Sequence, residues 1–305
     1  MAYMDMALPE FTGKFSTQEA CMEAVFEARW PNGFRCPHCD HDVGYRLTTR
    51  PVVQCAHCRK QTWITANTLF HKSQTPLPKW FLLIYLFAHD KGGRSTLSLA
   101  KLLGMHYATT WFIVQKIRLA MASRDEGLTL AGYIELDEAF FGGRHHSGGK
   151  KGKAPKYNKQ PVLVMVESEG QRAGNLVMRV IPDEHMASLA PVIEQKIESE
   201  PPGQWFRADA WGAHHVVGIF GHRIKMSYVP PSEQDSVLRC VNLAVSHAKR
   251  FFRGTYHQYC KTHMQRYLDE FCYRWNRRHL EKQLAFHLLK ACVLHTPINY
   301  SQIPA

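Results

Sequence analysis

The chain has 305 residues, of which 45% are hydrophobic and 21% charged, values typical of globular proteins that exclude a fibrous or wholly disordered chain. The longest apolar run, residues 80–88, is too short to span a bilayer. The formal net charge of +12 indicates a polyanionic partner, with nucleic acid ahead of an acidic membrane surface.

The N-terminal segment carries Asp5 and Glu10 and lacks the basic start of a signal peptide, so we expect a cytoplasmic protein with no membrane partner. Residues 12–30 have the pattern of a short helix, and Ser16 with Glu19 matches a capping box at its start. A Pro-Asn-Gly sequence then ends the helix.

Four of the nine cysteines form two Cys-x-x-Cys pairs in the turn-rich segment that follows. A reducing compartment keeps thiols free, so a tight quartet indicates a metal site rather than two disulfides. Residues 41–54 can form a hairpin that brings the pairs together, and four thiolates complete the tetrahedron that zinc prefers. A redox pair and free buried cysteines are the alternatives, and His38 and His57 are rival ligands. We predict a structural zinc ribbon held by Cys36, Cys39, Cys55 and Cys58.

Three helices are predicted next, over residues 78–89, 95–103 and 107–121. The last two flank Gly104 and have the pattern of a helix-turn-helix, with a plain helical hairpin as the alternative. The basic chain and the ribbon upstream favour DNA binding. The side chains predicted to reach phosphates or base edges precede the first of these two helices or lie exposed on the second: Arg94, Thr109, Thr110, Gln115, Lys116 and Arg118.

Beyond a domain boundary expected near residues 122–131, strands alternate with helices, which predicts a mixed sheet covered by helices. Asp183 is the predicted N-cap of the first of these helices. The predicted strands cover 133–137, 160–167, 175–181, 205–209 and 223–229, and the predicted helices cover 186–198, 236–253 and 261–290.

Two aspartates, Asp137 and Asp209, stand at the ends of predicted strands. A carboxylate in such a place is costly unless it binds a cation or a hydrogen-bond donor. On neighbouring strands the two carboxylates could share divalent metals, and paired metals stabilise the attacking and leaving oxygens of phosphoryl transfer. The alternative is that each aspartate is a turn or cap residue.

A basic segment with several glycines, residues 144–159, follows soon after Asp137 and contains no acidic residue. A solvated surface loop is one interpretation of this pattern. Beside a metal site, we interpret Lys150, Lys151 and Lys153 as contacts for a phosphate backbone.

The last predicted helix carries Glu270, Arg274 and Arg277 at the spacing of a single helical stripe. Opposite charges at these positions are typical of an ion-pair ladder on a protein surface. A functional stripe is the other interpretation.

Six motifs follow one another along most of the chain: residues 29–39 (RWPNGFRCPHC), 135–143 (ELDEAFFGG), 207–211 (RADAW), 246–249 (SHAK), 253–257 (RGTYH) and 267–278 (YLDEFCYRWNRR). In this order they resemble bacterial insertion-sequence transposases of the DDE superfamily, in the ISXO-like group with an N-terminal zinc ribbon. Each motif alone is weak, and together they are specific.

The resemblance implies an RNase H-like catalytic domain in which Asp137 is the first catalytic aspartate and Asp209 the second. The third family position is Asn or Glu in a late helix, followed by a Lys that Lys249 matches. His247 departs from this pattern, and Asn242 is its rival. The implied catalytic ions are Mg²⁺ or Mn²⁺, and an imidazole ligand would favour Mn²⁺ or Zn²⁺. The Glu-Arg-Arg stripe matches a signature of some family members.

We therefore predict an α+β multidomain protein with a zinc ribbon, a helix-turn-helix and an RNase H-like α/β domain with a mixed sheet. Its function would be to bind the terminal inverted repeats of an insertion sequence as double-stranded DNA, cut a strand and transfer it, as a homo-oligomer. The alternatives are a zinc-ribbon DNA-binding protein, a degenerate transposase that binds without cutting, and a nuclease that does not join. The predicted ranges are 1–72 for the N-terminal helix and ribbon, 73–124 for the helix-turn-helix, 130–290 for the catalytic domain and 291–305 for a tail.

Overall fold

The structure is a computed structural model that describes residues 6–142, 159–170, 172–198, 204–209, 212–227, 237–256 and 261–303. The predicted phosphate contacts Lys150, Lys151 and Lys153 lie outside these residues. Within the described part of the chain, no helix combines the length and the apolar character that a membrane span needs.

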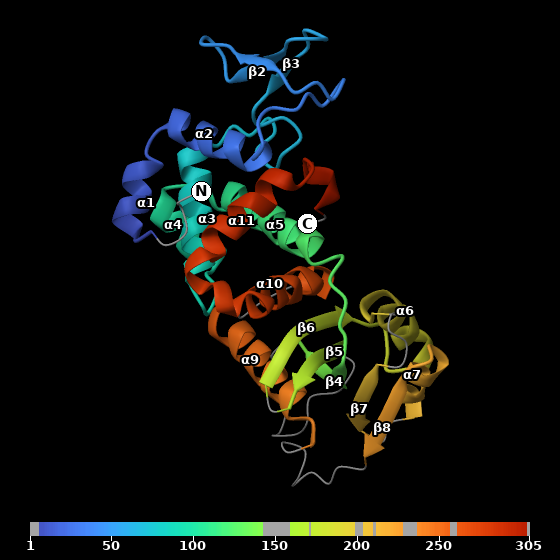
Figure 1. The fold of residues 1–305 in the computed structure, drawn as a ribbon. Helices are drawn as coiled ribbons and strands as arrows, with labels where there is room; N and C mark the ends of the chain where they lie inside the picture. The colour runs from blue at the N-terminus through green and yellow to red at the C-terminus, as the bar shows by residue number, and fades with distance from the viewer. Residues whose placement is uncertain are drawn as a thin grey trace. The chain divides into compact units, whose positions relative to one another are not determined.

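The chain divides into two compact units, which we describe separately (Figure 1). The first combines Met1–Arg124 with Leu280–Ala305, and the second is Asp125–His279. The predicted catalytic range 130–290 therefore extends into the first unit. The physical reason is helix α11 (Leu284–Leu294), which packs against other helices of the first unit.

The N-terminal helix predicted over 12–30 is two helices, α1 (Leu8–Lys14) and α2 (Gln18–Arg29). The predicted cap is also displaced by one residue. Thr17, rather than Ser16, caps α2, because its hydroxyl accepts a hydrogen bond from the Ala20 backbone N–H at 3.1 Å. The Ser16 hydroxyl instead donates to a backbone carbonyl of the preceding turn.

The core of the first unit is helical. Helices α3 (Leu77–His89) and α5 (Tyr107–Arg124) both contact α11. Between α5 and α3 lies α4 (Thr96–Leu103), which begins at the capping hydroxyl of Ser95 and ends at Gly104 in the left-handed region, with φ +56°. The bounds of α4 follow the predicted helix closely, because Ser95 and Gly104 cap its two ends.

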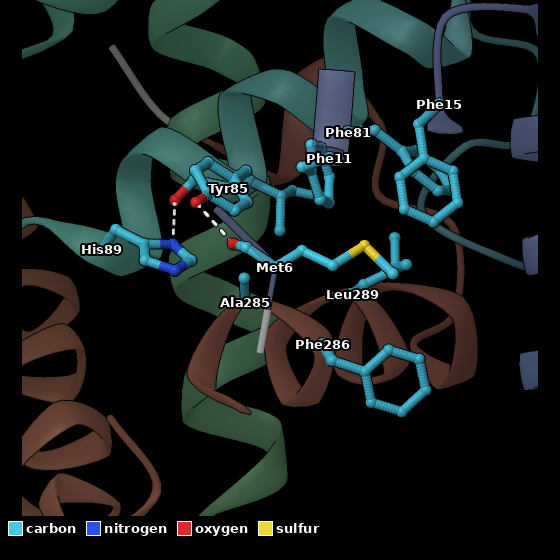
Figure 2. A pocket seen from close by; sticks show the side chains of 10 residues that line it. Met6, Phe11, Phe15, Phe81, Tyr85, His89, Ala285, Phe286 and Leu289 are labelled. Atoms are coloured by element: carbon cyan, nitrogen blue, oxygen red, sulfur yellow. Dashed lines mark hydrogen bonds between the residues drawn. The ribbon is translucent and has the colours of Figure 1, made fainter. Parts of the chain in front are cut away.

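A small apolar pocket lies in this helical core, lined by side chains of α1, α3 and α11 (Figure 2). The Tyr85 hydroxyl donates to the Met6 carbonyl at 2.8 Å, and the Tyr85 ring stacks on His89. Phenylalanine rings fill much of the remaining wall. The contacts tie the chain before α1 to the middle of α3.

The cysteine-rich segment folds as a small antiparallel sheet of β1 (Gly44–Arg46), β2 (Val52–Cys55) and β3 (Gln61–Trp63). Strands β1 and β2 form the hairpin predicted between the two cysteine pairs, with Gly44 opposite Cys55. Gly44 lies against Phe34, where an added Cβ would collide with the ring, so the position needs a glycine.

The second unit is built on a five-stranded sheet in the order β6-β5-β4-β7-β8. Strand β5 is antiparallel to β4 and β6, and β7 and β8 are parallel to β4. This mixed sheet has the strand order of the RNase H-like fold, which confirms the predicted fold class. The strands are β4 (Tyr133–Phe141), β5 (Gln160–Glu169), β6 (Arg172–Val180), β7 (Trp205–Asp209) and β8 (Arg223–Ser227).

Helices cover both faces of this sheet, and alternation along β4 separates two cores. Ala139 and Phe141 pack with α9 (Arg239–Thr255) and α10 (Met264–Asn276). Ile134 and Leu136 pack on the other face. That face is covered by α6 (Met186–Lys196), η2 (Gly212–His215) and α7 (Val216–Ile219).

Two predicted helices differ in detail. His185 is the N-cap residue of α6, and the predicted cap Asp183 accepts hydrogen bonds from the His185 N–H and the Ser188 hydroxyl. The predicted helix 261–290 is interrupted, because Leu280 departs from helical backbone angles. Its pieces are η3 (Lys261–His263), α10, η4 (Arg278–Gln283) and α11, and a last turn η5 (Tyr300–Gln302) follows.

Candidate functional sites

The four cysteines of the ribbon lie at two turns of the same construction. At the first, the Cys36 N–H donates to the carbonyl of His41, and the Asp40 N–H donates back to the Cys36 carbonyl. The second repeats both bonds with Cys55 as the first cysteine. The residue after each pair adopts a left-handed backbone, with φ +59° at Asp40 and +57° at Arg59. The two turns therefore present their sulfurs in the same way.

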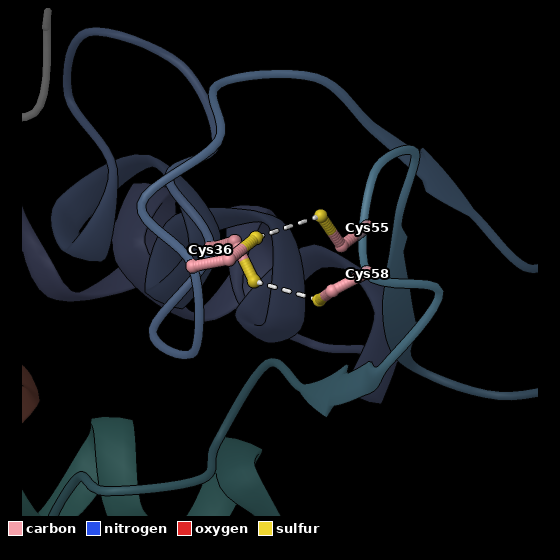
Figure 3. Close-up of side chains that lie close together, drawn as sticks. Cys36, Cys55 and Cys58 are labelled. Atoms are coloured by element: carbon pink, nitrogen blue, oxygen red, sulfur yellow. Dashed lines mark hydrogen bonds between the residues drawn. The ribbon is translucent and has the colours of Figure 1, made fainter.

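The sulfur geometry fits a tetrahedral metal ion (Figure 3). The four Sγ atoms all lie within 4.8 Å of one another, and the pairs Cys36–Cys58 and Cys39–Cys55 are each 3.6 Å apart. Zinc–sulfur bonds of about 2.3 Å in a tetrahedron place the sulfurs about 3.8 Å apart. Four sulfur ligands complete such a site and leave no position for a substrate, so the site is structural.

The predicted DNA contacts on α5 are mostly buried, which corrects the sequence prediction. Thr110, Gln115 and Arg118 are fully buried, and Lys116 is 9% exposed. Helix α5 packs against both α4 and α11, so its polar positions are enclosed together with its apolar ones. Thr110 donates its hydroxyl to a backbone carbonyl of the same helix, and burial lowers the pKa of Lys116.

The start of α5 remains exposed, including the predicted contact Thr109 and its neighbours His106 and Tyr107. In a helix-turn-helix, the first residues of the second helix are those that reach base edges. Arg94, before α4, is half-buried and pairs with Asp90 at 3.3 Å. The exposed surface of this motif is therefore smaller than the sequence predicts.

The two aspartates of the predicted catalytic site lie side by side. Leu136 on β4 is in register with Ala208 on β7, so Asp137 and Asp209 are the next residues on adjacent parallel strands. Neighbouring strands are about 4.8 Å apart. Strand β7 ends at Asp209 as predicted, but β4 continues to Phe141, so Asp137 lies within its strand rather than at the predicted end. The parallel pairing of the two strands thus brings together two acids that are distant in the chain.

The electrostatics of Asp137 follow from this neighbourhood. Burial raises its pKa to about 6, and the charges of Asp209 and Glu138 act in the same direction. The Glu138 backbone N–H donates to the Asp137 carboxylate at 2.8 Å and opposes the shift. Two carboxylates that disfavour each other's ionisation form a site that a cation would stabilise.

A buried histidine links the end of β7 to the middle of β4. His214, in η2, has no exposed surface, and its Nδ1 lies 2.9 Å from an Asp209 carboxylate oxygen. Its Nε2 lies 3.0 Å from Glu138. Burial lowers the pKa of His214, but the bonds to Asp209 and Glu138 outweigh it and raise the pKa to about 10. The His214 ring is therefore protonated at neutral pH, and this imidazolium links β7 to β4.

Helix α9 is fixed to β4 by Glu135. One Glu135 carboxylate oxygen accepts hydrogen bonds from the backbone N–H groups of Cys240 and Val241, at 2.7 and 3.0 Å. A carboxylate at a helix N-terminus satisfies free N–H groups and complements the helix dipole. Glu135 shares a face of β4 with Asp137, so the first turn of α9, with Asn242, begins next to the two aspartates.

Lys249 and His247 lie on different sides of α9. The charge of Asp137 acts on Lys249, opposing the lowering of its pKa by burial and by nearby cations. Asn242 precedes Lys249 by two helical turns and points within about 20° of it, whereas His247 points about 160° away. The His247 ring instead meets the edge of Trp275, with centroids 5.7 Å apart.

The three residues of the Glu-Arg-Arg stripe do not form one continuous row of ion pairs; they form two separate ion pairs. Glu270 is fully buried, accepts hydrogen bonds from the Tyr256 hydroxyl and pairs with Arg274 at 3.0 Å. Arg277 pairs with Asp125 at 2.6 Å. Because Glu270 and Arg274 are enclosed, the pair is not an exposed surface ladder.

Sequence reasoning missed three of these residues, Glu135, Glu138 and His214. Glu135 and Glu138 flank Asp137 within a motif already noted, and a pair of acids beside a catalytic candidate was the available signal. His214 carried no comparable signal. It follows Asp209 by five positions in the sequence, and only the folded chain brings its ring into contact with both strands.

Two family models match two separate regions of the chain. Residues 129–276 match the ISXO2-like transposase domain, and residues 16–61 match the transposase zinc-ribbon domain. Together they confirm the resemblance to insertion-sequence transposases with an N-terminal zinc ribbon, because the chain carries a region similar to each of the two domains.

A curated relative is a protein in transposable element ISH50 of Halobacterium salinarum. It is 28% identical over 130 residues, which are 41% of this chain and 42% of the relative, so the match spans less than half of either protein.

Solved structures give a looser likeness. One is a simian T-cell lymphotropic virus intasome in complex with a PP2A regulatory subunit, at 13% identity, TM-score 0.31, and coverage of 63% of this chain and 67% of that one. Another is the Mos1 strand transfer complex, at 10% identity, TM-score 0.30, and coverage of 72% and 78%. The resemblance to insertion-sequence transposases rests on the family models.

Proposed function

We propose that the chain is a DDE-type transposase that binds the terminal inverted repeats of its insertion sequence, cuts a strand at each and joins the freed 3′-OH to target DNA. The observation that supports this most is the pairing of Asp137 and Asp209 on adjacent parallel strands, inside the segment matched by the transposase model. Paired carboxylates on such strands are suited to hold divalent ions.

The residues present fit hard divalent ions. Asp137 and Asp209 offer carboxylate oxygens, the ligands that Mg²⁺ prefers and Mn²⁺ accepts, and burial beside a second acid disfavours the metal-free ionised pair. When bound, the ions supply an activated water and a counter-charge for the leaving 3′ oxygen. The chain's own part is to hold both carboxylates close together and aimed at one place.

We propose Asn242 as the third member of the site. Its helix begins at the Glu135 cap next to the aspartates, and it shares a side of α9 with Lys249. An amide oxygen is also a ligand that suits Mg²⁺ better than the imidazole of His247. Lys249 would contact a phosphate close to the cut.

His214 would act as a positioning residue. Its Nδ1 contact leaves Asp209 one orientation of the carboxylate, and its Nε2 contact ties that orientation to Glu138, the residue after Asp137. The imidazolium also offsets the repulsion between the acids around it.

The ribbon and the exposed start of α5 would recognise the terminal repeats as double-stranded DNA, with zinc as the structural ion of the ribbon. Joining two ends requires a homo-oligomer, and the enzyme would act on DNA in a bacterial cytoplasm. Glu270, Arg274 and Arg277 would support α10 behind the site. The basic segment with Lys150, Lys151 and Lys153 would contact phosphates.

Strand cleavage and strand transfer on terminal-repeat DNA, with Mg²⁺ or Mn²⁺, test the proposal. We expect the wild-type protein to nick and join the ends, and Asp137→Ala or Asp209→Ala to lose both reactions while DNA binding persists. Glu194→Ala, at an exposed acid of α6, is the matched control and should leave both reactions intact.

Other outcomes overturn the proposal in different ways. Binding without nicking would make the protein a DNA-binding or degenerate transposase. Nicking without joining would make it a nuclease of the same fold.

A further inference from the structure

One face of the β4-β7-β8 half of the sheet carries an ordered set of side chains that the proposed site does not use. The cross-strand register places Tyr133, Trp205 and Arg223 in one row, and Glu135, Arg207 and Lys225 in the next. The row of Asp137 and Asp209 follows. Successive rows on one face are about 6.6 Å apart, because every second residue points the same way.

This face is open to solvent. The exposed fractions of Tyr133 and Trp205 are 63% and 40%, and the three basic side chains are also exposed. Helices α9 and α10 contact strands β4, β5 and β6, and Figure 1 shows both helices on that half of the sheet. Large exposed aromatic groups beside each other are a sign of a binding surface.

The rings are already arranged in parallel. The Tyr133 and Trp205 rings stack at 18° with centroids 6.2 Å apart, and the Arg223 guanidinium lies 5.2 Å from the Trp205 ring. Stacking on one another and on an arginine limits the freedom of the rings before any ligand binds. Pre-ordered rings lose less conformational entropy on binding.

The charge of the face is positive. Glu135 is the acid of these two rows, and it is 3% exposed and bonded to the N-terminus of α9. Arg207, Arg223 and Lys225 therefore present positive charge outward without a competing exposed carboxylate in their rows. Arg207 also donates to the Val237 carbonyl, which leaves part of its guanidinium for a ligand.

We propose that this face binds single-stranded DNA, with bases on the Tyr133–Trp205 pair and phosphates on Arg207, Arg223 and Lys225. Aromatic platforms beside basic side chains are the way proteins hold single strands, because unpaired bases expose ring faces and a duplex hides them. Arg207 lies on the same side of β7 as Asp209, two residues before it in the strand. A strand released at the cut would be held next to the site, a role that rests on the proposed function, whereas the binding itself does not.

The test measures binding of a short oligothymidylate to the full chain by fluorescence anisotropy over a series of salt concentrations, in an Asp137→Ala background without divalent ions. Trp205→Leu should weaken binding roughly tenfold or more, and Trp205→Phe should restore most of the affinity. Arg223→Ala with Lys225→Ala should lower the slope of log K against log salt by about 1.4, or about 0.7 for each lost contact.

Arg172→Ala, at an exposed arginine on the opposite edge strand β6, is the matched control and should change affinity little. A terminal-repeat duplex should bind all these variants equally. Unchanged affinity and slope for the single strand would overturn the proposal, and so would equal weakening for single strand and duplex. Because the cleavage site is disabled throughout, failure of the proposed function leaves this result unaffected.

Discussion

The two proposed metal sites of this chain are built in opposite ways. The ribbon collects its four sulfurs from two tight turns of the same design, each fixed by bonds between residues that are neighbours in sequence. The acidic site takes Asp137 and Asp209 from strands that meet only when the sheet forms, and it depends on His214 and Glu135 for alignment. A site of the first kind is local and depends on its metal, and one of the second kind is held by the fold.

Loss of the ribbon's metal should have the largest effect. Cys58→Ser, or a strong chelator, should unfold residues 36–63, because binding of a structural zinc provides much of the folding energy of a small sheet. Proteolysis within the ribbon and the disappearance of its backbone NMR signals would measure the change. A chelated ribbon that stays protected would contradict the view that the metal holds it.

Asn242→Ala should follow in size, with cleavage reduced by about two orders of magnitude, whereas His247→Ala should stay within about threefold of wild type. The difference arises because Asn242 shares a side of α9 with Lys249 and His247 does not. Cleavage rates over a Mn²⁺ titration compare the two. A larger loss for His247→Ala would assign the third position to the histidine instead.

His214→Asn should weaken Mn²⁺ binding about 10- to 100-fold, because residues that orient a metal ligand have effects of this size. Electron paramagnetic resonance of free Mn²⁺ measures the affinity directly, without DNA. His215→Asn, at the exposed neighbour, is the control. Equal affinities for the two variants would show that Asp209 needs no partner.

The smallest effect concerns stability and pH. The pKa of Asp137 is about 6, above its ordinary value of 3.8, so the metal-free protein loses stability as pH rises from about 4 through 6. Asp137→Asn should therefore raise Tm by a few degrees at neutral pH, corresponding to roughly 1–2 kcal/mol, and by nothing near pH 4. Thermal scans at both pH values, without metal, test the sign. The reverse order of Tm would mean that burial and the neighbouring acids do not disfavour the ionised Asp137 carboxylate.

Features written in local sequence were predictable. The cysteine pairs, the stop of α4 at Gly104 and the strand that ends at Asp209 all lie where their patterns indicate. Local chemistry decides these features, so spacing alone reveals them.

Features that depend on packing were not predictable. Gln115 and Arg118 are polar, so the sequence predicts that they are exposed. Both are buried, because α5 packs against α4 and α11. His214 and Glu138 meet across two strands, and no spacing in the chain indicates that contact. The order of the strands came from the family resemblance rather than from the pattern of any one strand.

The hydrogen bonds from Cys240 and Val241 to Glu135 have a consequence for how mutations would be interpreted. A helix anchored to a strand through one buried carboxylate cannot slide along that strand without breaking the two hydrogen bonds from its backbone N–H groups to that carboxylate. Glu135 therefore sets the height of Asn242 above the sheet although it needs no contact with DNA. Its replacement would silence chemistry from a distance, and a screen for inactive variants would count a structural anchor among the reacting groups.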